Sequence, residues 1–259
     1  MTKEKIRIAF FDIDGTLMPF HHKRPHPVIL ETLEKLQSQG ILCFAASGRP
    51  PYIIPDLGFD GCLAFNGGLC ELCDGTILFE RPMDPVQVKE LTLDCEQKGY
   101  GVIMAGTQDM GANFYDQNMD DYMKSASQRC IPDPEFEKRF DKPCFQLMAA
   151  IPTQDRDPML AGYDKLDHTS WHPLACDITA AGTSKGEALR AVCEKLGIPV
   201  SESIAFGDAA NDLSMIEAAG IGIAMGNAQD VVKEKATRIT ESVDEDGVYT
   251  EFRRMGYVN

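Results

Sequence analysis

The pattern of apolar and polar residues near the N-terminal end predicts two strands joined by a helix. Residues 6–11 form a short run of apolar and β-branched side chains, as expected of a buried strand. Residues 28–39 place their apolar positions on one helical face, and Gly40 supplies a helix stop. Residues 41–46 predict a second buried strand. This order indicates a right-handed crossover and a parallel sheet.

The next part of the chain is more mixed. Three short strands and one helix are predicted, at residues 63–65, 68–72, 76–80 and 85–98. Asn66-Gly67 and Asp74-Gly75 separate the strands as turns, and Gly99 ends the helix. From there to about residue 181, prolines interrupt the pattern, among them Pro132, Pro134, Pro143, Pro152 and Pro158. This middle third resembles an α+β module more than another strand-helix repeat.

Regular alternation returns after Gly182. The expected elements are a helix at 186–196, a strand at 203–206, a helix at 211–219, a strand at 221–225 and a short helix at 227–235. The predicted fold class is therefore α/β: a Rossmann-like parallel-sheet core built from both ends of the chain, with an inserted α+β domain. We expect residues 1–82 and 183–259 to form the core and residues 83–182 the insert.

The charge of the chain narrows the choice of partners. Its 259 residues carry 40 acidic and 25 basic side chains, which gives a formal net charge of −15. Such a surface repels nucleic acids and anionic lipid heads, so we expect neither as a partner. If the substrate is a phosphate ester, a local cation must reverse the field in the site, and magnesium suits that task.

Two further features bear on location and cysteine chemistry. No apolar run approaches the ~20 residues of a membrane span, and residues 1–5 lead directly into the first strand, so we expect a cytoplasmic protein. The nine cysteines are odd in number and scattered through apolar stretches. Cys70 and Cys73 form a lone CxxC without a second pair, which favours packing in a reduced compartment over zinc or redox use.

Two carboxylates, Asp12 and Asp14, stand where the first predicted strand ends. Gly15 permits a tight turn after them, and Thr16 can close that turn by hydrogen bonding. In open α/β sheets the working site lies beyond the carboxyl ends of the strands, so both acids fall in the expected crevice. The plain alternative is an ordinary acidic turn.

A second acidic pair, Asp208 and Asp212, follows the apolar run at 203–206. Alone, this pair is equally well explained as acidic capping of a helix start. Together with Asp12 and Asp14 it gathers four carboxylates, which repel one another by ~4 kcal/mol per close pair unless they are neutralised. Oxygen ligands in that number suit a hard cation, and a partly hydrated Mg²⁺ fits best.

Two other segments offer groups for a phosphate. Ser47 closes the second strand, where its hydroxyl and the following amides can donate to an anion. Lys185 brings a positive charge to the helix that opens after Gly182, although the upstream glycine of a Walker loop is absent. Taken singly, Ser47 is more simply explained as a helix N-cap, and Lys185 is equally well explained as an exposed lysine at a helix start.

The order of these motifs resembles the haloacid dehalogenase-like superfamily and, within it, the Cof-type phosphatases. The matching segments are Asp12-Ile13-Asp14-Gly15-Thr16, Ser47-Gly48-Arg49, Ser184-Lys185-Gly186, Gly207-Asp208-Ala209-Ala210-Asn211-Asp212, Phe65-Asn66-Gly67-Gly68 and Asp244-Glu245-Asp246-Gly247-Val248. The resemblance covers both ends of the chain. It implies that the insert between the second and third motifs is the large α/β cap domain of that subfamily, which sets substrate specificity.

The resemblance also implies a role for each matched residue. Asp12 would be the nucleophile that forms an aspartyl-phosphate, and Asp14 the general acid and then the general base. The implied metal residues are Asp12, Asp14 (through its carbonyl), Asp208 and Asp212, the last directly or through water. Ser47, Lys185 and Asn211 would bind the phosphoryl oxygens, while Arg49 faces either the substrate or the domain seam.

The function expected from the resemblance is Mg²⁺-dependent hydrolysis of a small organic phosphate monoester, such as a sugar phosphate, a nucleotide or a phosphorylated cofactor. The alternatives are a phosphosugar mutase or phosphotransferase, and a sensor that binds a phosphorylated metabolite without turning it over. We expect a monomer or a weak homodimer. Candidate specificity residues in the insert are Asn113, Tyr115, Asp116, Lys124, Arg129, Gln146, His168, Trp171 and His172, each of which is more simply explained as structural.

Overall fold

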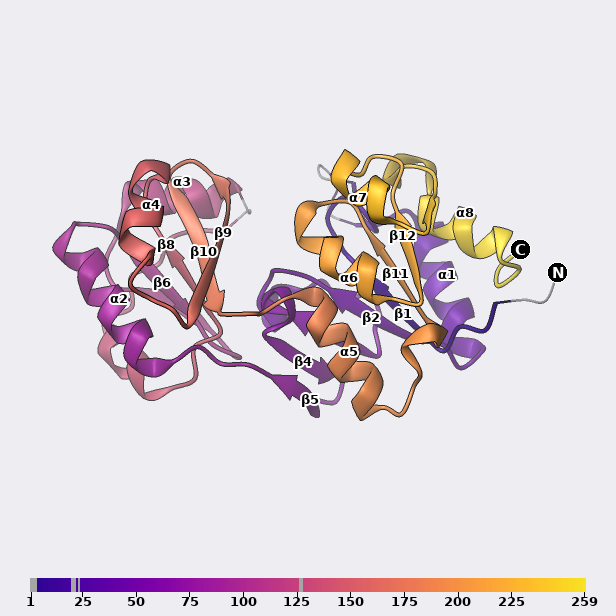
Figure 1. Ribbon diagram of the computed structural model, residues 1–259, viewed down its shortest axis with the longest axis horizontal. Helices are drawn as coiled ribbons and strands as arrows, with labels where there is room; N and C mark the ends of the chain where they lie inside the picture. Colours follow the sequence, from indigo (N-terminus) through magenta and orange to yellow (C-terminus); the bar gives the residue numbers. More distant parts are fainter. Residues whose placement is uncertain (1–3, 20–21, 23, 126–127) are drawn as a thin grey trace. The chain divides into compact units, whose positions relative to one another are not determined.

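The chain forms two compact units (Figure 1). The computed structural model describes residues 4–19, 22, 24–125 and 128–259, with only the backbone of residues 170 and 171. The core unit comprises the chain up to Arg49, Ile53–Glu80 and Ser184–Asn259, and the inserted unit comprises Pro50–Tyr52 and Arg81–Thr183. The core is thus assembled from both ends of the sequence.

The core unit contains one sheet with helices on both faces. Its strands are β1 (Ile8–Phe11), β2 (Leu42–Ala46), β3 (Gly61–Ala64), β4 (Leu69–Leu72), β5 (Ile77–Glu80), β11 (Ser203–Gly207), β12 (Ile221–Ala224) and β13 (Arg238–Ile239). Its α-helices are α1 (Pro27–Ser38), α5 (Lys185–Lys195), α6 (Leu213–Ala218), α7 (Asp230–Lys235) and α8 (Gly247–Arg254). Its short 3₁₀ turns are η2 (Phe65–Gly67), η4 (Val200–Glu202), η5 (Ala210–Asp212) and η6 (Val243–Glu245), while η1 (Pro51–Ile53) is divided between the two units.

The strand order of the core sheet brings the two ends of the chain together. In the described part it reads β13-β12-β11-β1-β2-β3-β4-β5. β1 pairs in parallel with β2 on one side and β11 on the other, with Phe11 opposite Ala45 and Phe206. The residues that follow these three strands therefore emerge at the same edge of the sheet.

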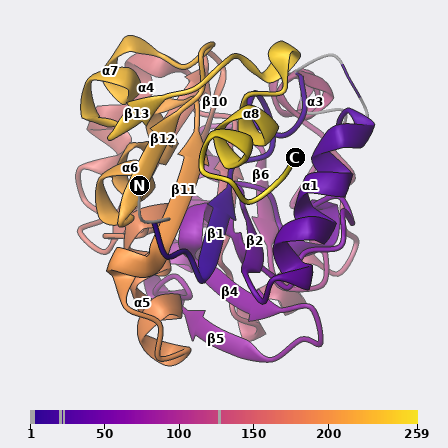
Figure 2. The ribbon, with the colours of Figure 1, turned by 90° about the vertical axis from the view of Figure 1, so that its right-hand side faces the viewer.

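Helices cover both faces of this sheet. α1 and α8 lie on one face, while α5, α6 and α7 lie on the other (Figure 2). Phe252 of α8 packs against Phe206 and Phe11, with ring centroids 5.3 and 6.1 Å apart. Phe11 also stacks on Phe206, with ring centroids 5.5 Å apart. These fully buried rings pack α8 against β1 and β11, the strands whose carboxyl ends lead into Asp12 and Asp208.

The inserted unit is an antiparallel sheet with its own core. Its elements are α2 (Pro85–Gln97), β6 (Val102–Ala105), β7 (Met110–Ala112), α3 (Gln117–Ser125), η3 (Phe136–Asp141), β8 (Gln146–Ala149), α4 (Thr153–Leu160), β9 (Leu166–His172) and β10 (Ala175–Ala180). The sheet order is β7-β6-β8-β10-β9. Val88 and Leu91 of α2 join Leu147 and Ile178 in a separate buried cluster. The predicted fold class, a parallel-sheet core with an α+β insert, is confirmed.

Local departures from the predicted elements occur at the loops of the core. Residue 65 was expected to end a strand, but β3 ends at Ala64 and Phe65 has a left-handed backbone with φ of 53°. The helix predicted at 211–219 is divided into η5 and α6. Both differences arise because tertiary contacts, rather than local propensity, set the backbone there.

The two cysteines of the CxxC segment lie in different environments. Cys70 is buried in the core, whereas Cys73 is exposed. Burial raises the pKa of the Cys70 thiol well above its usual value. Cys70 therefore serves as a small apolar core residue, as its surroundings in the sequence indicate.

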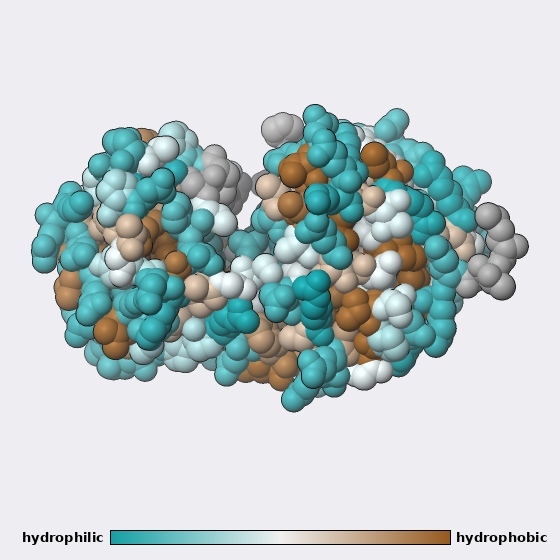
Figure 3. All heavy atoms as spheres, in the orientation of Figure 1, coloured by the Kyte–Doolittle hydropathy of each residue, from teal (hydrophilic) through white to brown (hydrophobic). Residues whose placement is uncertain are grey.

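The face of the molecule that is seen in Figure 3 is mostly hydrophilic, and its apolar side chains lie in small groups. Exposed large apolar residues are distributed over both units, for example Ile77, Leu93 and Ile131. Among the residues that the structure describes, no helix combines the length and apolar character needed to cross a membrane.

Replacing Gly222 with alanine should destabilise the core unit. An added Cβ would lie inside the 3.0 Å limit of real Cβ contacts, against the backbone carbonyl of Ile216 in α6. We expect a loss of roughly 1–3 kcal/mol in the free energy of unfolding, measured by urea denaturation. Gly162→Ala, where nothing lies within 4 Å, is the matched control. Equal stability of the two variants would contradict the tight packing of α6 on β12.

Candidate active site

Three carboxylates converge at the carboxyl edge of the core sheet. Asp12 follows β1, Asp208 follows β11, and Asp212 ends the η5 turn. A ligand oxygen from each lies within 4.8 Å of the others, and all three residues are buried. The neighbouring parallel strands explain why residues 196 positions apart meet here.

Lys185 is the counter-charge of this cluster. It is the first residue of α5, and its side chain is fully buried. Nζ donates to Asp12 Oδ1 at 2.7 Å and to Asp212 Oδ1 at 2.6 Å. Ser184 caps the helix by accepting a hydrogen bond from the backbone N–H of Glu187 at 3.2 Å, which fixes where α5 begins. The alternative of an exposed lysine at a helix start is therefore wrong.

The pKa values in the cluster reflect burial and crowding of like charge. Burial raises the pKa of Asp12 well above its usual value, and the neighbouring Asp212 adds to this effect against the opposing charge of Lys185. Burial and Asp212 likewise raise the pKa of Asp208 to about 7. Burial alone would lower the pKa of Lys185, but Asp12 and Asp212 outweigh it and the pKa is raised. Lys185 therefore stays charged.

Asp212 is held by hydrogen bonds on both carboxylate oxygens. While Oδ1 accepts from Lys185, Oδ2 accepts from the backbone N–H groups of Asp208 and Ala209, each at 3.0 Å. Gly207 makes room for this carboxylate, since a Cβ there would lie inside 3.0 Å of it. Asp212 thus fastens the loop that carries Asp208 to the ammonium group of Lys185.

The donor set fits a hard divalent cation. When all three carboxylates are ionised, the single ammonium of Lys185 leaves an excess of two negative charges, which a divalent ion would neutralise. The carboxylate of Asp208 accepts only long hydrogen bonds from the described residues, from Thr16 Oγ1 at 3.4 Å and Asn227 Nδ2 at 3.5 Å. Both of its oxygens therefore keep capacity to bind a cation. Carboxylate oxygens in this number suit Mg²⁺.

Asp14 lies apart from the three clustered carboxylates. Both of its oxygens accept hydrogen bonds from Arg49 Nη2, each at 2.8 Å, and its side chain is 39% exposed. The turn between Asp14 and the cluster needs Gly15, whose φ is +87° and whose added Cβ would overlap the Asp208 carboxylate. The role left open for Arg49 in the sequence is, in this structure, that of the partner of Asp14.

The residues expected to bind phosphate occupy three different loops. Ser47 is buried after β2, and its hydroxyl accepts from the backbone N–H of Arg49 at 3.2 Å. Asn211 is exposed in the η5 turn, where its Nδ2 donates to Asn66 Oδ1 at 3.1 Å. The roles assigned to Ser47, Lys185 and Asn211 as phosphate ligands stay predictions.

Asn227 is a site residue that the sequence did not reveal. Its Nδ2 donates to the Gly15 carbonyl at 2.8 Å, and its Oδ1 accepts from the backbone N–H of Val243 at 2.8 Å. It thereby ties the turn after Asp14 to the C-terminal part of the chain. An isolated asparagine after a strand carries no sequence signal, because its partners are distant along the chain.

Comparison with known proteins decides the family. The profile described as haloacid dehalogenase-like hydrolase matches residues 9–252. The chain belongs to this family. The expected resemblance is thereby confirmed, and with it the assignment to the phosphoric monoester hydrolases.

Individual haloacid dehalogenase-like relatives match over nearly the whole chain. The putative phosphatase YkrA of Bacillus subtilis is 30% identical over 96% of this chain and 98% of its own. The phosphatase BT1666 from Bacteroides thetaiotaomicron superposes with a TM-score of 0.89 at 28% identity, covering 99% and 97% of the two chains. The subclass IIB sugar phosphatase BT4131 gives 0.84 at 29%, covering 97% and 100%.

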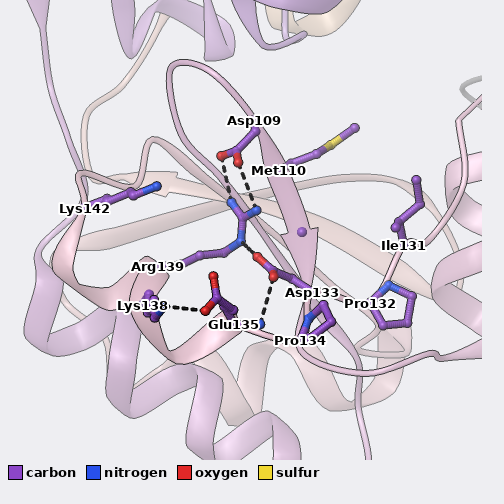
Figure 4. A pocket seen from close by; sticks show the side chains of 11 residues that line it. Asp109, Met110, Ile131, Pro132, Asp133, Pro134, Glu135, Lys138, Arg139 and Lys142 are labelled. Atoms are coloured by element: carbon purple, nitrogen blue, oxygen red, sulfur yellow. Dashed lines mark hydrogen bonds and ion pairs between the residues drawn. The ribbon is translucent and has the colours of Figure 1, made fainter.

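The inserted unit of this haloacid dehalogenase-like hydrolase carries a cavity of about 400 Å³ beside β7 (Figure 4). Arg139 lies in its wall, where it is bound by Asp109 through both carboxylate oxygens and by Asp133 at 2.6 Å. Two carboxylates thus neutralise the one guanidinium. None of the predicted catalytic residues lines this cavity.

Several candidate specificity residues of the insert hold its own backbone. Asn113 Oδ1 accepts from the N–H of Val102 at 2.8 Å, and Asp116 accepts from the N–H groups of Gly101 and Met119. Gln146 differs, because its buried Oε1 has no hydrogen-bond partner among the described residues. The side chain of Trp171 lies outside the described residues. Structural roles therefore account for Asn113 and Asp116.

The metal-free hydrolase should lose stability as the pH rises from 4 to 7. Because the folded-state pKa of Asp208 is about 7, the folded state binds more protons than the unfolded state in this window. Asp208→Asn removes the free-energy cost of ionising this buried carboxylate. In chelator, the variant should therefore have a larger free energy of unfolding than the parent. The gap should grow by roughly 2–3 kcal/mol between pH 5 and pH 8 in urea denaturation.

Two controls accompany the pH series. Asp56→Asn changes an exposed carboxylate and should give a gap that does not vary with pH. Adding Mg²⁺ should raise the melting temperature of the parent more than that of Asp208→Asn. A pH-independent gap for Asp208→Asn would show that this carboxylate is not desolvated.

Proposed function

We propose that this chain is a Mg²⁺-dependent phosphatase that hydrolyses small organic phosphate monoesters through an aspartyl-phosphate on Asp12. The observation that carries the proposal is the state of the Asp12 carboxylate. Its Oδ1 is held by the buried ammonium of Lys185, while its Oδ2 takes no hydrogen bond from the described residues. One oxygen is thus fixed and the other is available for attack on phosphorus.

The residues around Asp12 divide the work of the first step. Oδ2 of Asp12 attacks phosphorus, the bond to the ester oxygen breaks, and the phosphoryl group passes to the carboxylate. Lys185 holds the nucleophile in line, and Ser47 and Asn211 donate hydrogen bonds to the phosphoryl oxygens. A Mg²⁺ ion held by Asp12, Asp208 and the Asp14 carbonyl, with Asp212 behind them, would screen the negative charges that otherwise keep phosphate and carboxylate apart.

Asp14 acts first as the general acid and then as the general base. In the first step its carboxyl group donates a proton to the departing ester oxygen, which leaves as an alcohol. In the second step the Asp14 carboxylate takes a proton from water, the water oxygen bonds to phosphorus, and inorganic phosphate leaves Asp12. Arg49, which now pairs with Asp14, must release this carboxylate to the ester oxygen when substrate binds.

The substrate class is a small phosphorylated metabolite. The sugar phosphatase name carried by BT4131, similar over the whole chain, supports a sugar phosphate. The net charge of −15 supports a single compact anion bound at a local cation over a polyanionic polymer. We assign the inserted unit to recognition of the part of the substrate beyond the phosphate.

Release of inorganic phosphate from p-nitrophenyl phosphate and a panel of small esters tests this function. Turnover should require Mg²⁺, stop in excess chelator, and fall to the background rate in Asp12→Asn. The reason is that an amide at residue 12 can neither attack phosphorus nor contribute a metal charge.

Asp56→Asn, an exposed change on the same unit, should turn over like the parent and so control for handling. Failure of the parent to release phosphate from any ester, with Mg²⁺ present, would contradict the proposal. Transfer of phosphate to a second sugar hydroxyl in place of water would indicate a mutase. Tight binding without turnover would indicate a sensor.

Asp14→Asn should separate the two chemical steps. With p-nitrophenyl phosphate, whose leaving group needs little protonation, we expect a burst of nitrophenolate equal to the enzyme concentration, followed by slow phosphate release. With an alkyl phosphate, whose leaving group needs a proton, kcat should fall by about 10²–10⁴. Rapid-quench and stopped-flow measurements report both. An equal effect on the two esters without a burst would remove Asp14 from the proton transfers.

A further inference from the structure

The turn between β3 and β4 has an unusual backbone. Phe65, Asn66 and Gly67 are consecutive residues with φ values of 53°, 55° and 99°. An Asn-Gly hairpin turn explains the last two, but not the left-handed Phe65, a large and fully buried side chain. Such a conformation persists only where the surroundings determine it.

The first contacts that determine it come from the segment after β2. The backbone N–H of Asn66 donates to the Ser47 carbonyl at 2.9 Å, and that of Phe65 donates to the Arg49 carbonyl at 3.1 Å. The Asn66 amide also packs over Gly48, where an added Cβ would lie 3.1 Å from Nδ2. The turn therefore holds the whole Ser47–Arg49 segment.

The same turn reaches the two other loops of the site. Asn66 Oδ1 accepts from Asn211 Nδ2 at 3.1 Å, which links it to the loop that carries Asp208 and Asp212. At Gly67, an added Cβ would lie within 3.0 Å of the Ser184 carbonyl and of Ala188 Cβ, so the start of α5 packs directly on the turn. Three phosphate-binding candidates, Ser47, Lys185 and Asn211, thus border one three-residue turn.

We propose that Asn66 is a positioning residue of the phosphate site, an inference that rests on the proposed function. Its backbone fixes the Ser47 segment, and its side-chain oxygen orients the Asn211 amide so that both donors address one phosphoryl group. Asn66 touches neither the nucleophile nor the metal carboxylates among the described contacts. Its effect should therefore fall on phosphate affinity and not on the chemical step.

Asn66→Gly is the informative variant, because glycine keeps the left-handed backbone and removes only the side chain. We expect KM for p-nitrophenyl phosphate to rise about tenfold, with kcat changed by less than about threefold. The dissociation constant of inorganic phosphate, measured by isothermal titration calorimetry, should rise by a similar factor. Asp74→Gly, which removes a side chain from the next hairpin turn, should change neither quantity.

A double-mutant cycle tests the route of the effect. If Asn66 acts through the Asn211 amide, Asn66→Gly in an Asn211→Ala background should add little to the loss caused by Asn211→Ala alone. Additive losses would overturn the coupling. Unchanged KM and phosphate affinity in Asn66→Gly, or equal losses in Asp74→Gly, would overturn the proposal.

The two proposals fail in different ways. If the parent turns over esters and Asn66→Gly behaves like the parent, the positioning role alone is wrong. If the parent turns over no ester but binds inorganic phosphate, and Asn66→Gly weakens that binding, the phosphatase function is wrong and the positioning role stands. If the parent neither turns over esters nor binds phosphate, both are wrong.

Discussion

A buried ammonium group shared by two buried carboxylates organises the core unit. Lys185 comes from the segment after the insert, Asp12 from the first strand and Asp212 from the η5 turn, so one charge joins three separate parts of the chain. Removing it would leave uncompensated buried charges, which is far more costly than losing a surface ion pair. The position of Asp12 and the start of α5 are thereby set by the same contact.

The carboxylates around Lys185 can carry more negative charge than its one ammonium group neutralises. Buried carboxylates that are not neutralised repel one another until a cation binds. Burial and this repulsion together raise the pKa values of Asp12 and Asp208. The inserted unit shows the opposite arrangement at Arg139, where the charges are paired among themselves. Among the residues that the structure describes, Asp12, Asp208 and Asp212 are the group of acidic side chains that could hold a metal ion.

Much of this architecture could be predicted from the sequence, because local patterns of apolar residues determine where the strands end. Contacts between distant residues could not be predicted. Asp12 and Asp208 were placed at one sheet edge because apolar runs precede both and parallel strands end together. The sequence could not show that Arg49 pairs with Asp14, that both oxygens of Asp212 are used, or that Phe65 is left-handed. Those features depend on contacts between residues far apart along the chain, which no local pattern records.

The position of β1 has a consequence for synthesis on the ribosome. This strand emerges first, yet one of its two parallel neighbours, β11, follows only after the whole insert, with Ile8 opposite Ser203. At about 5–20 residues synthesised per second, β1 waits roughly 10–40 s for that partner. The insert, with a core of its own, can complete its folding in the interval. The nascent chain can therefore complete its inserted unit before its core unit, and the contact of Lys185 with Asp12 and Asp212 forms last.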